Sequence, residues 1–185
     1  MEAKKKAGLI IIIALIVIAF FMQIVSLIRS EVLVTDRLLN GALIVGLLSA
    51  LLYACAGYEK NVAKYYKVFM MIYAAAMVYS VVAGVLYASA HGISKPVILA
   101  SSIPTVIASL LAVFLAFIKN LGKKLSTMFA TLILVLVCCA LLYRVIVLGD
   151  FAPYYSIYIG NVILTVMVFL FVKNKYADKD RRGTT

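Results

Sequence analysis

Arg144 is the residue of this sequence with the clearest chemical potential, because it is a charged side chain inside a long apolar stretch, residues 125–148. A charge in apolar surroundings is costly and is often functional. A guanidinium can hold a carboxylate or a phosphate through two parallel hydrogen bonds, so Arg144 predicts a site for an anionic solute. The alternative interpretation is structural. Arg144 lies about 6 Å from the end of its stretch at 1.5 Å per residue, and there it can reach polar surroundings or pair with Asp150, Asp36 or Glu31.

Other polar side chains gather in the same half of the neighbouring apolar stretches. Pro104 lies beside two of them and weakens its own helix there, because proline lacks a backbone amide donor. This asymmetry predicts a polar pocket that opens on one side of the protein, although each residue could instead bridge two helices. The candidate ligand-binding residues are Arg144, Asn161, Gln23, Asn40, Thr105, Ser102 and Tyr87.

Tyrosine is the most frequent aromatic residue, with 12 tyrosines and no tryptophan. Tyr66, Tyr73, Ser80 and Tyr87 recur at every seventh position and therefore share one face of a helix. Tyr73 lies deep in its apolar stretch, where a hydroxyl needs a partner. A hydrogen bond between helices and the lining of a polar cavity are the two interpretations.

Few residues of this chain could do catalytic chemistry. His91 is the single histidine, and the sequence has no nucleophile-elbow, zinc-protease or phosphate-loop motif. We therefore predict no enzyme activity, no cofactor and no metal. A lipid-modifying enzyme that uses His91 with Asp150 or Glu31 is a weaker alternative. The cysteines lack the spacing of a metal site or a disulfide framework: Cys55, Cys138 and Cys139.

Six apolar stretches must position these residues. The chain of 185 residues is 66% hydrophobic, and its mean hydropathy is +1.13. A helix of about 20 apolar residues crosses the ~30 Å of a bilayer core. The sequence therefore predicts an all-α, polytopic membrane protein with a single six-helix domain over residues 1–185 and a short basic tail over 173–185. The predicted spans are residues 7–28, 38–56, 68–89, 97–118, 125–148 and 154–172.

The basic residues are unevenly distributed between the connections. Net charge is +11, and fourteen of the 18 Lys and Arg residues fall on the side that holds both termini. Such a bias places that side in the cytoplasm. We therefore predict cytoplasmic termini in a bacterial-type plasma membrane, with the positive charge facing lipid headgroups rather than nucleic acid.

Small residues recur at four-residue spacing on three of the predicted helices, which permits close helix approach in lipid. Internal packing of these helices into a tight centre is one prediction, and docking of partner subunits or self-association is the other. Lys-Asn recurs at 60–61, 119–120 and 173–174, which suggests three tandem helical hairpins or only basic helix ends. The small residues are Ala42, Gly46, Ala50 and Ala54, then Ala76, Ser80, Gly84 and Ala88, then Ala108 and Ala112.

These features favour small-solute transport, either by this chain alone or as the substrate-binding membrane subunit of a transporter. The size, the six helices, the cytoplasmic termini and the outward pocket are similar in organisation to substrate-binding subunits of energy-coupling-factor vitamin importers. In that family, small residues of the first helix dock the partner, whereas residues 8–28 here carry no such run. The alternative is a non-catalytic structural, regulatory or immunity-type membrane protein that acts through helix contacts.

Overall fold

The computed structural model describes residues 2–29, 34–59, 62–90, 92, 95–118, 121–148 and 155–182. These residues form six α-helices and no strand, which confirms the prediction of an all-helical protein. The helices are α1 (Glu2–Arg29), α2 (Val34–Glu59), α3 (Val62–Ala90), α4 (Lys95–Phe117), α5 (Lys123–Leu148) and α6 (Tyr155–Arg182).

Three of the helices contain segments that are long and apolar enough to cross a membrane, namely Lys64–Leu86, Pro96–Phe117 and Lys123–Val147. A helix of 22 residues is about 33 Å long, close to the ~30 Å of bilayer hydrocarbon. Shorter apolar segments lie in α1 and α2, at Ala7–Met22 and Ile44–Ala56. These features are compatible with a membrane protein.

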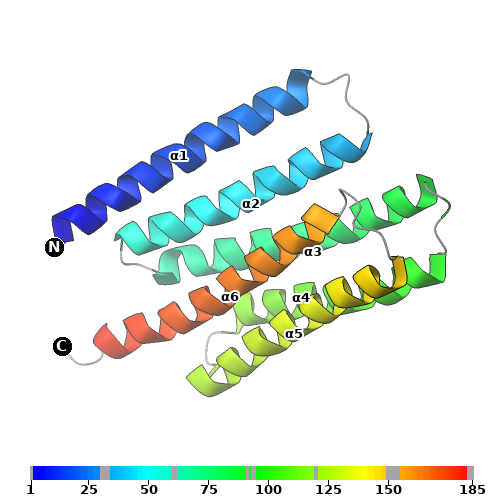
Figure 1. Ribbon diagram of the computed structural model, residues 1–185. Helices are drawn as coiled ribbons and strands as arrows, with labels where there is room; N and C mark the ends of the chain where they lie inside the picture. Colours follow the sequence, from blue (N-terminus) through cyan, green and yellow to red (C-terminus); the bar gives the residue numbers. More distant parts are fainter. Residues whose placement is uncertain are drawn as a thin grey trace.

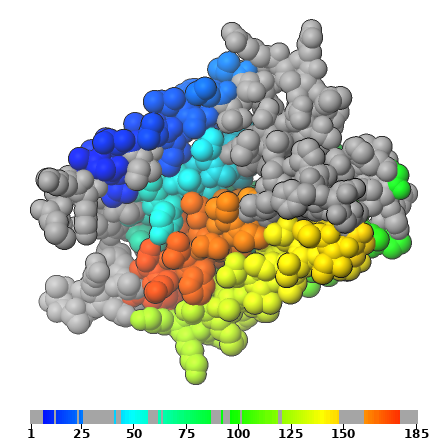
Figure 2. All heavy atoms as spheres, viewed as in Figure 1, coloured from blue at the N-terminus to red at the C-terminus, as the bar shows by residue number. Residues whose placement is uncertain are grey.

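Helices α3, α4, α5 and α6 form a ring in which each packs against two neighbours, and this set is called the four-helix ring below. Among the described residues, α3 does not contact α5 and α4 does not contact α6. Helix α2 packs outside the ring against α3 and α6, and α1 contacts α2 alone within the described part of the chain. Figure 1 shows this order, and in Figure 2 α1 and α5 lie along opposite edges of the molecule.

Both termini lie at the same end of the bundle, which is called the terminal end (Figure 1). The ends of α2 and α4 and the starts of α3 and α5 lie there too, and the other helix ends lie at the opposite end. Consecutive helices are in contact along the whole chain, as their short connections predicted. Helix α6 continues to Arg182, so residues 173–182 of the predicted tail are helical.

The core of the protein surrounds α3, which contacts α2, α4 and α6. Phe69, Met70, Tyr73 and Met77 of this helix have no exposed surface. Phe69 stacks on Phe171 of α6 with ring centroids 4.2 Å apart. Helix α5 buries a single stripe, and its other described side chains are half-buried or exposed, including Ile146 at 79% exposed. The buried stripe consists of Ser126, Ala130, Ile133, Val137, Ala140 and Arg144.

The small residues of α3 and α4 lie in the interior, but α2 does not share that interface. Among the described residues α3 contacts both α2 and α4, but α2 makes no contact with α4, so the three helices do not all pack on one another. Helix α6 contacts both α2 and α3. Its Phe171 ring packs on Phe69 of α3 and on Tyr53 of α2. Ala54, Ala76, Ser80, Gly84, Ala108 and Ala112 are buried, Gly46 and Ala50 are half-buried, and the side chains of Ala42 and Ala88 lie outside the described residues.

Candidate functional site

Arg144 ends the buried stripe of α5 and faces the interior of the four-helix ring. Its side chain is only 3% exposed. Its Nη2 atom donates a hydrogen bond to Ser102 Oγ of α4 over 3.3 Å, and Arg144 has further interactions in the protein. Ser102 in turn donates to the backbone carbonyl of Ile98 over 2.7 Å. Because its own proton is used there, the hydroxyl oxygen of Ser102 can only accept from the guanidinium.

Asn161 of α6 is another buried polar residue of the ring interior, and it is 5% exposed. Its side-chain nitrogen is buried and donates no hydrogen bond to any described residue. Its backbone carbonyl accepts a hydrogen bond from Thr165 Oγ1 over 2.6 Å, and Tyr73 of α3 lies 2.8 Å from the same Oγ1 atom. Because the Thr165 proton is used, Tyr73 must be the donor. Tyr73 of α3 therefore holds, through Thr165, the turn of α6 that carries Asn161.

Three contacts set the register of the ring helices. They join Tyr66 with Leu115, Tyr73 with Thr165, and Ser126 with Tyr176. Counting along the antiparallel helices from these pairs places Ser80, Ser102 and Arg144 at one level. Thr105 and Asn161 lie about one turn deeper, roughly 5 Å along the axis. All five side chains are buried, and they are called the polar cluster below.

The interior changes character toward the terminal end of the ring. The next level toward the terminal end still holds buried hydroxyl groups, those of Tyr73, Thr165 and Ser109. The next level, called the apolar layer, consists of fully buried side chains: Met70, Ala112, Ile133 and Val168. The polar levels of the ring interior are therefore followed, toward the terminal end, by one apolar level.

The polar cluster combines a positive charge with hydrogen-bond donors, which are the groups that suit an anionic ligand. Its guanidinium supplies charge, the amide nitrogen of Asn161 supplies an unused donor, and Thr105 adds a hydroxyl. A buried donor without a partner is unfavourable by about 1–3 kcal/mol, and a ligand oxygen would remove that penalty. Charge-assisted hydrogen bonds from arginine to carboxylate or phosphate are roughly twice as strong as neutral ones.

The structure brings together Arg144, Ser102, Thr105 and Asn161 of the predicted ligand-binding set. The side chains of Gln23, Asn40 and Tyr87 lie outside the described residues. The same holds for the proposed partners of Arg144 and for the alternative catalytic set: Asp36, Glu31, Asp150 and His91.

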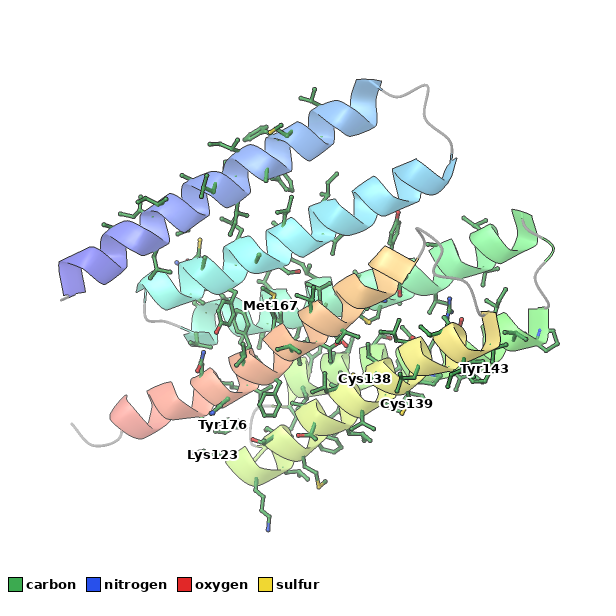
Figure 3. All side chains as sticks on the ribbon, viewed as in Figure 1. Lys123, Cys138, Cys139, Tyr143, Met167 and Tyr176 are labelled. Carbon is green, nitrogen blue, oxygen red and sulfur yellow. The ribbon has the colours of Figure 1, made fainter. Side chains whose placement is uncertain are left out.

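Sequence reasoning missed the residues that position the cluster. Thr165 is one turn after Asn161 on the same helix face, and this i, i+4 spacing of two polar residues was the available signal. Tyr176 falls within the predicted tail, because the lysines around it hide the continuation of the helix. It lies beside the start of α5 (Figure 3) and is 9% exposed.

The remaining features offer little chemistry. A small cavity of about 70 Å³ lies outside the ring, between α2, α3 and α6, and is lined by Tyr53, Ala56, Val62, Phe171 and Asn174. Within the described residues, no group of three His, Cys, Asp or Glu side chains could hold a metal ion. Cys138 and Cys139 are adjacent on α5, half-buried and exposed respectively, and both are free thiols (Figure 3).

No known protein family, curated protein or solved structure matches this chain.

Proposed function

We propose that this chain is a membrane protein with six spanning helices that binds a small anionic solute in the polar cluster. It acts as a transporter or as the substrate-binding membrane subunit of one. The observation that carries the proposal is the burial of the Arg144 guanidinium in the same ring interior as Asn161, whose buried amide nitrogen has no hydrogen-bond partner among the described residues. A bound carboxylate or phosphate would accept hydrogen bonds from both groups.

The distribution of charge supports the orientation in the membrane. Exposed lysines of α3, α5 and α6 lie at the terminal end, and basic residues favour the cytoplasmic side. The terminal end therefore faces the cytoplasm, and the polar cluster lies in the outer half of the membrane. The exposed lysines are Lys64, Lys67, Lys123, Lys124 and Lys173.

The proposal is tested by native mass spectrometry of the protein released gently from its own membrane. We expect the wild-type protein to carry a small anionic molecule that Arg144→Gln loses. The control variant, Lys124→Gln, removes one exposed positive charge at the terminal end and retains the molecule. Size-exclusion chromatography and helical circular dichroism establish that each variant is folded, and Arg144→Lys replaces Arg144→Gln if the latter is not.

A second measurement identifies the class of anion. Thermal unfolding is followed in sodium acetate, glutamate, phosphate and chloride at equal ionic strength. A ligand present at 100 times its Kd stabilises the folded protein by about 2.7 kcal/mol, so the preferred anion raises Tm in the wild type but not in Arg144→Gln. A folded wild type that carries no small molecule and responds to none of these anions refutes the proposal. Arg144 would then be structural, and a protein that acts through helix contacts would be favoured.

A further inference from the structure

The terminal end of the four-helix ring is fastened by two tyrosines. Tyr66 of α3 donates to the backbone carbonyl of Leu115 in α4 over 3.3 Å. Tyr176 of α6 donates to the carbonyl of Leu121, in the connection between α4 and α5. Ser126 of α5 lies 2.6 Å from the Tyr176 hydroxyl, and it must be the donor because the Tyr176 proton is already used.

A cation completes this set of contacts. The Nζ atom of Lys175, in α6, lies 4.0 Å from the ring centroid of Tyr66, in α3. A cation at this distance over an aromatic face is attracted by the ring. The contacts therefore join α3 to α4, α5 to α6 and α6 to α3, while the covalent connection joins α4 to α5. Tyr66, Tyr176, Ser126 and Lys175 are together called the tyrosine clasp.

The two ends of the ring are held differently. Between the clasp and the polar cluster lies the apolar layer, and Thr165 and Tyr176 are eleven residues, about 16 Å, apart along α6. A constriction lined by apolar side chains excludes hydrated ions. At the opposite end, Arg144 of α5 donates a hydrogen bond to Ser102 of α4, and both residues belong to the polar cluster itself.

We infer that the tyrosine clasp and the apolar layer form the closed inner gate of the protein. A solute in the polar cluster can pass to the terminal side only after the clasp opens and α5 moves away from α6. This inference rests on the proposed function for its meaning, because a gate needs a solute to control. Its geometry is independent of the identity of that solute.

The test measures access to the interior from the terminal side. The three native cysteines are replaced by serine, and Ile133→Cys places a reporter in the apolar layer, where Ile133 has no exposed surface. A charged, membrane-impermeant maleimide is applied to vesicles of either orientation, and the rate of labelling is measured. We expect the reporter to react slowly in the otherwise unchanged protein.

Opening the clasp should raise the labelling rate from the terminal side. Tyr176→Phe removes two hydrogen bonds and keeps the ring, so the open population and the labelling rate should rise about 5- to 30-fold. Ser126→Ala removes one of the two hydrogen bonds and should give a smaller rise. The matched control is Tyr53→Phe, which makes the same chemical change at the same end but on α2, outside the four-helix ring.

The outcomes separate cleanly. An unchanged rate in folded Tyr176→Phe and Ser126→Ala overturns the inference, as does an equal rise in Tyr53→Phe, which would indicate general loosening. The maleimide needs no bound solute. A protein that carries no anion but shows the expected rates would therefore refute the proposed function and leave the clasp established as the closure of the ring.

Discussion

The hydrogen bond between Tyr73 and Thr165 allows the sharpest prediction about stability. Both side chains have no exposed surface, and their oxygens are 2.8 Å apart. Tyr73 is the donor, because Thr165 spends its proton on the carbonyl of Asn161. The two partners are therefore not equivalent, and removing one should differ from removing the other.

Tyr73→Phe takes away the donor and leaves only an acceptor lone pair of Thr165 unused. Hydrogen bonds between membrane helices contribute about 0.6 kcal/mol on average and about 1.7 kcal/mol at most, so Tyr73→Phe should destabilise within that range. Thr165→Val keeps the shape of its side chain but leaves the Tyr73 hydroxyl proton buried without its acceptor. An orphaned buried donor costs about 1–3 kcal/mol, so Thr165→Val should destabilise more.

The double variant provides the decisive comparison. With both partners apolar no orphaned donor remains, so Tyr73→Phe/Thr165→Val should unfold at nearly the same free energy as Tyr73→Phe alone. The coupling between the two sites is then about 1 kcal/mol or more. Equilibrium unfolding of the purified protein in mixed micelles, titrated with a denaturing detergent, gives these free energies. The donor assignment is refuted if Tyr73→Phe is as damaging as Thr165→Val, or if the two effects simply add.

Two further predictions concern Asn161 and the glycines of α2. Asn161→Leu replaces a buried amide whose nitrogen has no hydrogen-bond partner among the described residues. The variant should stabilise the ligand-free protein by about 1–3 kcal/mol and abolish anion binding. A variant less stable than the wild type would contradict the unpartnered state of the Asn161 nitrogen. Gly46→Ala should stabilise by about 0.5–1 kcal/mol, because an added Cβ meets nothing within 4 Å. Gly41→Ala should show no such gain, because its Cβ would lie 2.6 Å from the hydroxyl of Tyr79, and equal unfolding free energies for the two variants would contradict the packing of Tyr79 on Gly41.

The helical class of the protein follows from local sequence properties. Apolar runs of this length satisfy their backbone hydrogen bonds within one helix, so their existence and approximate bounds can be read without knowledge of neighbours. Arg144 could also be singled out from the sequence alone, because it is a charged residue within an apolar run. The end of α6 was harder to predict, because a helix that leaves the apolar region retains its hydrogen bonds while its composition changes at Lys173.

Helix partners could not be predicted from the pattern of small residues. Small side chains permit close approach but do not name the neighbour, and α2 carries the same spacing as α3 and α4 without meeting α4 among the described residues. Helix α6 instead packs on both α2 and α3, through the aromatic contacts of Phe171 with Phe69 and Tyr53. Such contacts join residues about a hundred positions apart, and no local pattern encodes them.

By itself, the sequence determined the six helices, the uneven distribution of basic charge and the presence of one arginine among apolar residues. These are properties of single segments, and each follows from the cost of placing polar groups in apolar surroundings. Only the tertiary structure decided that Arg144, Ser102, Thr105 and Asn161 share one interior, and that Tyr66 and Tyr176 make hydrogen bonds at the other end of the same ring. The reason is geometric: a helix fixes which residues share its face, but the rotation and register of its neighbours decide what that face meets.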